Sequence, residues 1–124
     1  ERRFRSVAPE HPEYIVTLMD LGSLLVDRGK YPEADQTLCR ALGSLERIAG
    51  IPAANLPLGR NALAACRAAQ GRTAEADSLF RLSTPQAWTS VSLVPAAQRI
   101  ARARALRFYE SQGRVDMVAR INSS

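Results

Sequence analysis

Glycine recurs in this sequence at a fixed interval, and the interval limits the possible folds more than any other feature. Gly29, Gly71 and Gly113 lie 42 residues apart both times, each between a long polar residue and a basic one. The flanks repeat in register as well, since the tripeptide Glu-Ala-Asp begins at Glu33 and again at Glu75. Self-similarity at such a period is typical of proteins built from small tandem units. We therefore predict a single repeat domain over residues 1–124, with units at 9–50, 51–92 and 93–124, the last one truncated or degenerate, and residues 1–8 as the end of a preceding helix.

Each unit is predicted to consist of two helices on either side of its glycine. Apolar residues at three- and four-residue spacing share one face of a helix, and glycine ends a helix because it adopts a left-handed backbone without strain. The first helix opens at His11-Pro12 and ends at Gly29, with a predicted buried face of Leu18, Leu21, Leu24 and Leu25. The second restarts at Pro32 and stops at Gly50, with a buried face of Ala34, Leu38, Ala41, Leu42 and Leu45. The other predicted helices span about 54–70, 73–82, 95–112 and 115–121, so the fold class is all-α.

Small residues recur where two helices of a unit must approach each other closely. Gly22 and Ala64 are equivalent under the 42-residue period, and so are Ala34 and Ala76. A larger side chain at such a contact would push the helix axes apart. We therefore expect all four positions to lie at close helix contacts.

The composition excludes several classes of protein. Hydrophobic residues make up 46% of the chain and charged residues 23%, which is typical of a soluble globular domain. No apolar run approaches the roughly 20 residues of a transmembrane helix, so we expect no membrane insertion and a cytoplasmic protein. Cys39 and Cys66 lack the spacing of a metal site. We predict two reduced thiols packed at helix contacts, with a disulfide as the alternative, and no cofactor.

The large and small residues around the first glycine resemble the pattern of the tetratricopeptide repeat family. The matching residues are Leu21, Gly22, Leu25, Gly29, Tyr31, Ala34, Leu38 and Ala41. The usual repeat of this family is about 34 residues long, and the interval of 42 is similar to the longer variant of kinesin light chains and many bacterial proteins. The second unit departs from the pattern with Arg67 at the position of Leu25, and the third with Val118 at the position of Ala34.

The resemblance implies a right-handed α-α superhelix of about three helix pairs, whose first helices line a concave groove for peptides or partner helices. It also implies a non-catalytic interaction or scaffolding module. By the same resemblance, the chain is expected to be a fragment of a larger bacterial protein, such as the C-terminal regulatory part of a signalling Ser/Thr kinase.

Helical spacing selects the residues that would line such a groove. They lie on the first helix of each unit, on the face opposite the predicted core. The selected residues are Val16, Met19, Asp20, Ser23 and Asp27 in the first unit, Leu58, Asn61 and Ala65 in the second, and Ile100, Ala103, Arg104, Arg107 and Ser111 in the third. The groove is therefore predicted to run from an acidic end to a basic end, which would orient a bound peptide.

Other functions receive less support from the sequence. The only histidine, His11, precedes a helix-starting proline, and acidic residues such as Asp35 and Asp77 are predicted to lie in solvent-facing turns. We therefore predict no catalytic set. Arginines at 99, 102, 104 and 107 suggest nucleic-acid binding, but at about 100° per residue Arg104 and Arg107 share one side while Arg99 and Arg102 fall on another, so the four do not form a single stripe. A basic nucleic-acid-binding domain and a self-associating homodimer remain the alternatives to a protein or peptide partner.

Overall fold

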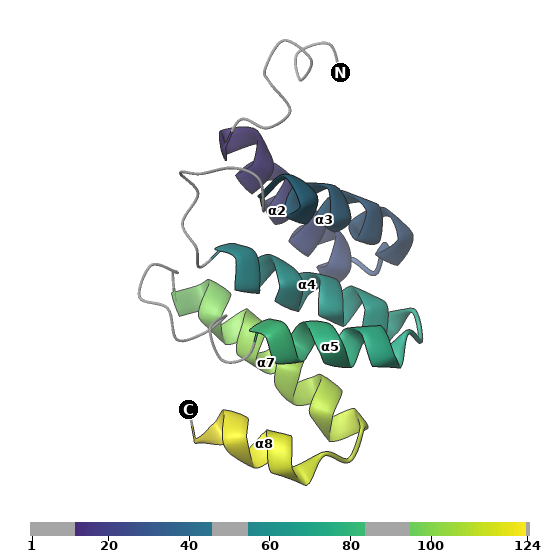
Figure 1. Ribbon diagram of the computed structural model, residues 1–124, viewed down its shortest axis with the longest axis vertical. Helices are drawn as coiled ribbons and strands as arrows, with labels where there is room; N and C mark the ends of the chain where they lie inside the picture. The colour runs from purple at the N-terminus through teal and green to yellow at the C-terminus, as the bar shows by residue number, and fades with distance from the viewer. Residues whose placement is uncertain (1–11, 46–54, 84–94, 124) are drawn as a thin grey trace.

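The computed structural model describes residues 12–45, 55–83 and 95–123, and these ranges consist of helices joined by short turns. In chain order the helices are α2 (Pro12–Asp27), α3 (Tyr31–Leu45), α4 (Asn55–Ala69), α5 (Thr73–Ser83), α7 (Pro95–Ser111) and α8 (Val115–Asn122) (Figure 1). No strand occurs within these ranges, so the described chain is all-α, as predicted. None of its helices combines the length and the apolar character that crossing a membrane would require.

The predicted helices are found close to their predicted positions. The helix predicted over 95–112 ends at Ser111, and the one predicted over 73–82 ends at Ser83. The predicted start at His11, the stop at Gly50, and the preceding helix over 1–8 lie outside the described residues. The joints between the predicted units also lie largely outside them.

The turns at the three repeated glycines share one backbone geometry. Gly29, Gly71 and Gly113 have φ angles of 78°, 81° and 68°, in the left-handed region that favours glycine. In each turn the next N–H donates to the carbonyl five residues earlier at 2.9 Å, namely Lys30 to Leu25, Arg72 to Arg67 and Arg114 to Tyr109. This bond is one of the two that define the glycine-ended helix terminus. The sequence period is therefore repeated in the backbone hydrogen bonds.

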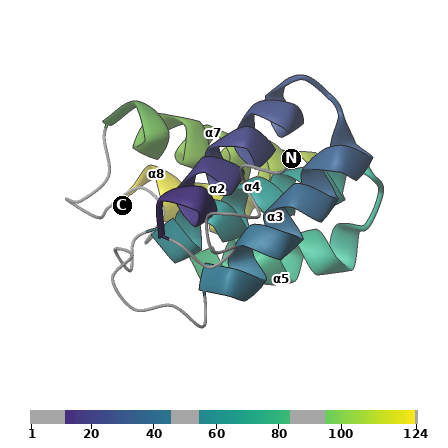
Figure 2. The ribbon, with the colours of Figure 1, turned by 90° about the horizontal axis from the view of Figure 1, so that it is seen from above.

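The helices form three hairpins, α2 with α3, α4 with α5, and α7 with α8. The hairpins follow one another along the long axis of the molecule, from α2 and α3 at one end to α8 at the other (Figure 1). Seen from above, α3 and α5 lie on one side and α7 on the opposite side (Figure 2). α4 contacts α2, α3, α5 and α7. The first helices of the hairpins therefore adjoin one another through α4.

The core has two parts, and each part joins neighbouring hairpins. The first part includes the fully buried Leu38 of α3 and Cys66 of α4. The second part contains three aromatic rings, with the ring centroid of Phe80 4.9 Å from that of Phe108 and 6.0 Å from that of Tyr109. Because each part crosses a hairpin boundary, burial in one hairpin depends on its neighbour.

The buried face of α2 differs from the predicted one. Of the four leucines expected to share it, Leu18 is buried and Leu25 half-buried, but Leu21 and Leu24 are 44% and 48% exposed. The residues buried in α2 are Ile15, Leu18, Met19, Gly22 and Val26. α2 packs against both α3 and α4. Its buried face is therefore wider than contact with one helix would require, and it is turned away from Leu21 and Leu24.

Gly22 lets α2 and α3 approach each other closely. A Cβ atom at this position would lie 2.5 Å from Cγ and 2.6 Å from Cδ2 of Leu38, much closer than van der Waals contact. The equivalent pair in the second hairpin is Ala64 and Phe80, both fully buried. The four small residues expected at close helix contacts, Gly22, Ala34, Ala64 and Ala76, are all buried.

Candidate binding groove

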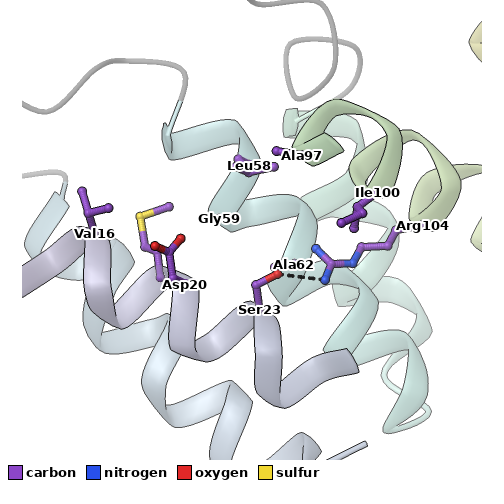
Figure 3. A pocket seen from close by; sticks show the side chains of 10 residues that line it. Val16, Asp20, Ser23, Leu58, Gly59, Ala62, Ala97, Ile100 and Arg104 are labelled. Atoms are coloured by element: carbon purple, nitrogen blue, oxygen red, sulfur yellow. Dashed lines mark hydrogen bonds between the residues drawn. The ribbon is translucent and has the colours of Figure 1, made fainter. Parts of the chain in front are cut away.

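The first helices of the three hairpins together line two adjoining pockets. We call the first the apolar pocket, because most of its lining is aliphatic. It has a volume of about 130 Å³ and is lined by Val16, Met19, Asp20, Ser23, Leu58, Gly59, Ala62, Ala97, Ile100 and Arg104. Figure 3 shows these side chains arranged around one space between α2, α4 and α7. Every hairpin therefore contributes to the apolar pocket.

The walls of the apolar pocket are set by how closely α4 approaches the first hairpin. A Cβ atom on Gly59 would lie 2.7 Å from Cε of Met19 and 2.9 Å from Cδ2 of Leu42. Glycine therefore brings the backbone of α4 against both α2 and α3. On the opposite wall Ile100 is 45% exposed, although it is a large aliphatic residue. An apolar side chain exposed at the mouth of a pocket is a favourable contact for an apolar ligand group.

We call the second pocket the basic pocket, because two arginines of α7 line it. Its volume is about 420 Å³, and its lining consists of Val26, Asp27, Tyr31, Ala65, Ala68, Ala69, Arg104, Arg107, Phe108 and Ser111. Three of these residues are alanines of α4, so α4 forms a low floor between α2 and α7. We refer to the two pockets together as the groove.

Arg104 lies at the border between the two pockets and lines both of them. It is only 7% exposed, although it carries a guanidinium group. Its Nη2 donates to Oγ of Ser23 at 3.0 Å and to Oδ1 of Asp27 at 3.1 Å. These bonds join α7 to α2, the first helices of the third and first hairpins. Arg104 therefore crosses the groove and separates its two pockets, as its contact with Ser23 shows in Figure 3.

The structure brings most of the sequence-selected residues together. The apolar pocket contains Val16, Met19, Asp20, Ser23, Leu58, Ile100 and Arg104, and the basic pocket contains Asp27, Ala65, Arg104, Arg107 and Ser111. The predicted acidic end of the groove is thus its α2 wall, and the predicted basic end is its α7 wall. Their charges are partly neutralised by each other, because Asp27 pairs with Arg104.

Two selected residues lie elsewhere. Asn61 is fully buried and lines neither pocket, and its Nδ2 donates to the carbonyl of Ala101 at 2.9 Å. It therefore joins α4 to α7 beneath the groove and does not face a ligand. Ala103 is exposed and also lines neither pocket.

Sequence reasoning missed several lining residues for different reasons. Gly59, Ala62 and Ala97 are small and apolar, and a search for polar or bulky contact residues passes over them. Ala62 lies four residues after Leu58, so a strict count of helical spacing along α4 would have selected it. Tyr31 is the first residue of α3, a helix excluded from the predicted groove, and no pattern in the sequence indicates its contribution.

A separate polar cluster lies outside both pockets, where α3, α4 and α5 meet. Nε of Arg67 is 2.8 Å from Asp35 and its Nη1 is 2.6 Å from Glu75, while Arg72 also contacts both carboxylates. Asp35 was predicted to lie in a solvent-facing turn, but it lies within α3 with its side chain only 16% exposed. Arg67 stands where the first unit has a leucine, and its positive charge pairs with Asp35. A leucine could not supply this charge, so the departure from the repeat pattern explains why the Asp35 carboxylate is mostly buried.

This cluster stabilises the ionised form of Asp35. Burial alone would raise the pKa of the carboxyl group. Hydrogen bonds from Arg67 and Cys39, together with the charges of Arg67 and Arg72, outweigh burial and hold the pKa of Asp35 below its usual value of 3.8. The hydrogen bond to Asp35 in turn raises the pKa of Arg67. The pair is therefore ionised at neutral pH and connects the first hairpin to the second.

Both cysteines are free thiols, but they lie in different surroundings. Cys66 is buried and donates to the carbonyl of Tyr31 at 3.1 Å, as expected for a thiol at a helix contact. Cys39 is exposed, contrary to the prediction, and its Sγ lies 3.4 Å from Asp35. Burial, followed by the charge of Asp35, raises the pKa of Cys66 to about 11, and burial with the hydrogen bond to Asp35 raises the pKa of Cys39. Both thiols are therefore protonated at neutral pH.

The contact between Asp35 and Arg67 recurs one period later in altered form. Asp77 is the equivalent of Asp35, and Tyr109 is the equivalent of Arg67. Burial and then the charge of Asp77 raise the pKa of the Tyr109 hydroxyl group. That hydroxyl group is buried without a hydrogen-bond partner among the described residues, and Asp77 pairs with Arg81 at 3.1 Å. The junction between the second and third hairpins therefore depends on aromatic packing at this position, whereas the junction between the first and second hairpins has an ion pair.

The four arginines of α7 do not form one surface. Arg104 crosses the groove, and Arg107 lines the basic pocket. Nη2 of Arg102 donates to the carbonyl groups of Ile121 and Asn122 at 3.2 and 3.4 Å, at the end of α8. Arg99 is exposed. This distribution agrees with the helical geometry expected from the sequence.

Within residues 12–45, 55–83 and 95–123, no group of three or more histidine, cysteine, aspartate or glutamate side chains is placed to hold a metal ion. The predicted role of His11 falls outside the described residues. Comparison of the sequence with family models and with curated proteins finds no match.

Proposed function

We propose that this chain is a non-catalytic binding module that holds a peptide or a helix of a protein partner in the groove between α2, α4 and α7. The observation that carries the proposal is the apolar pocket, whose lining comes from the first helix of every hairpin. Stacked helical repeats characteristically create extended concave binding surfaces of this kind. In this proposal the hairpins form a right-handed superhelix of the tetratricopeptide type, in keeping with the resemblance of the repeat pattern and the identical glycine turns.

The size of the apolar pocket favours a polypeptide ligand. Sites for small molecules usually have volumes of about 300–1,000 Å³ and bury most of the ligand. The apolar pocket, at about 130 Å³, is large enough for a side chain but smaller than such sites. In this proposal, a side chain that enters it belongs to a longer chain that continues over the neighbouring basic pocket, although the basic pocket, at about 420 Å³, would by volume alone also admit a small molecule.

The arrangement of charges gives less support to nucleic-acid binding. A phosphate backbone is bound by a surface of arginine and lysine side chains that can reach it. Arg104 is buried against Asp27, and Arg102 is bonded to the end of α8. Of the arginines of this helix only Arg99 and Arg107 are exposed, and of these two only Arg107 lines the groove, so the exposed arginines do not form one surface for a phosphate backbone. We therefore propose a protein partner, and a cytoplasmic signalling protein as the larger setting that the repeat resemblance implies.

Selection of a displayed random peptide library on the chain would test this function. We expect enriched peptides to carry an apolar residue that enters the apolar pocket. Ile100→Glu places a carboxylate at that pocket and is expected to weaken binding of the selected peptides at least tenfold, about 1.4 kcal/mol. Isothermal titration calorimetry would measure the affinity of each variant.

Leu82→Glu is the matched control for this experiment. Leu82 is also an exposed aliphatic residue, at 58%, but it lies on α5 and lines neither pocket. Peptides should bind this variant as tightly as the wild-type chain. Failure to enrich any peptide, or equal binding to the Ile100 variant, would contradict the proposal. A stable dimer in solution that Ile100→Glu dissociates would instead favour self-association through the groove.

A further inference from the structure

Arg104 is an unusual residue to find at the centre of a proposed binding groove, because its charged side chain is almost completely buried. The Nη2 atom is bound to Ser23 and Asp27 on the opposite wall. The floor beneath is made of α4 alanines, which leave room for the long side chain to cross. Fixing an arginine side chain costs conformational entropy, and here the two bonds to α2 have already fixed it before any ligand arrives.

The guanidinium group of Arg104 keeps unused hydrogen-bond donors. A guanidinium carries five N–H groups in a rigid plane and has no acceptor. Only Nη2 has hydrogen-bond partners among the described residues. Nε and Nη1 have no such partner, and neither atom is completely buried. In Figure 3 the terminal nitrogen of Arg104 that carries no dashed line lies beside the one bonded to Ser23, on the edge of the space between the lining residues. Three N–H groups are therefore available at the border between the two pockets.

We infer that Arg104 is a ligand-binding residue of the groove, which donates hydrogen bonds from Nε and Nη1 to an oxygen atom of the bound chain. This inference rests on the proposed function and adds a polar requirement to it. The ligand places an apolar side chain in the apolar pocket and an oxygen acceptor against Arg104 as it crosses to the basic pocket. A bound chain that places no oxygen atom at this point would leave these donors covered and unpaired, which is energetically costly.

Helix geometry sets the spacing between the two ligand groups. Ile100 and Arg104 are four residues apart on α7, so their backbones are separated by about 6 Å along the helix axis. Two residues of an extended chain span roughly 6.6 Å. The acceptor oxygen is therefore expected within about two residues of the apolar side chain. It is either a main-chain carbonyl or a side-chain carboxylate, since both accept hydrogen bonds from guanidinium.

The probe for this inference is the set of peptides selected on the wild-type chain. Arg104→Met keeps a long apolar stem but removes every donor, and Arg104→Lys keeps the charge without the planar donor group. Both variants are expected to bind these peptides at least tenfold more weakly than the wild-type chain. Arg99→Met, on the same helix but outside both pockets, should leave the affinity unchanged. Far-UV circular dichroism would verify that each variant keeps the wild-type helix content.

The source of the oxygen can be determined with the same peptides. Replacing their acidic residues with the corresponding amides should leave the effect of Arg104→Met intact when the acceptor is a main-chain carbonyl. When the acceptor is a carboxylate, the amide peptides should bind weakly to every variant. Their acidic parents should also lose affinity as salt concentration rises.

The results separate this inference from the function on which it rests. Peptides that bind Arg104→Met or Arg104→Lys as tightly as the wild-type chain, yet lose affinity for Ile100→Glu, would overturn the role of Arg104 and leave the proposed function standing. Loss of affinity in both Arg104 variants, with none in Arg99→Met, would support the inference.

Discussion

A single hydrogen atom in place of a side chain allows the closest helix contact in the first hairpin. Gly22 faces the branched end of Leu38, which is fully buried and surrounded by other core residues. The second hairpin solves the same problem with a different pair, Ala64 and Phe80. Side-chain size at one position is thus matched to that of its partner across the hairpin. A mismatch is expected to reduce stability even when the new residue is a better helix former.

Gly22→Ala is therefore expected to destabilise the chain by about 1–3 kcal/mol, because the added methyl group would overlap Leu38. Urea unfolding followed by circular dichroism would measure the change. Gly43→Ala is the control, since a Cβ atom on this glycine of α3 would meet nothing within 4 Å. There the higher helix propensity of alanine should increase stability by up to about 1 kcal/mol. Equal effects at both positions would show that close packing at Gly22 is unimportant.

The helices themselves were largely predictable from the sequence, whereas their orientation was not. Proline, glycine and apolar spacing depend on local chemistry, and they placed the ends of α5 and α7 to within a residue or two. The exposure of Leu21 and Leu24 depends on which neighbours α2 meets, and no local pattern encodes that. The same limit explains Asn61, whose buried bond to Ala101 becomes visible only once α4 and α7 are placed together.

The ion pair between α3 and α4 is a contact between elements, and it should make stability depend on pH. The pKa of Asp35 is lower in the folded chain than its usual value, mainly because Arg67 outweighs the effect of burial. The stabilisation is therefore complete above the unfolded pKa of about 3.9 and is lost as the pH falls through the lower folded value. We expect Asp35→Asn to be about 1–2 kcal/mol less stable than the wild-type chain at pH 7.

Urea unfolding at several pH values would test this expectation. The difference between Asp35→Asn and the wild-type chain should shrink as the pH falls below about 4. Asp77→Asn, at the equivalent position of the second hairpin, should cost only about 0.3–0.5 kcal/mol, because Asp77 pairs with an exposed arginine four residues away. A difference at Asp35 that does not change with pH would mean that the charge of this carboxylate does not stabilise the fold.

At the scale of the whole molecule, stability is expected to pass from hairpin to hairpin through the two parts of the core. Arrays of this kind behave as units coupled mainly to their neighbours. Phe80 is the fully buried residue whose ring connects α5 to the aromatic side chains of α7. Removing its ring should weaken the junction between the second and third hairpins more than it weakens the packing within the first hairpin.

Phe80→Ala is expected to lower the stability of the chain by about 3–5 kcal/mol. Hydrogen exchange measured by mass spectrometry should show the largest loss of protection in α7 and α8, with a smaller loss in α2 and α3. Leu82→Ala, an exposed change on the same helix, should alter stability by less than about 0.5 kcal/mol. Uniform loss of protection over all six described helices would instead indicate that the chain unfolds only as one unit.

The three equivalent glycine turns also restrict how such a gene can change in length. One residue inserted between Gly29 and the buried residues of α3 would rotate that helix face by about 100°, and its apolar stripe would turn toward water. An insertion at a joint between hairpins leaves the faces on both sides in place. Selection should therefore tolerate insertions and deletions between the units, and gains or losses of entire units, while it removes single-codon changes inside them.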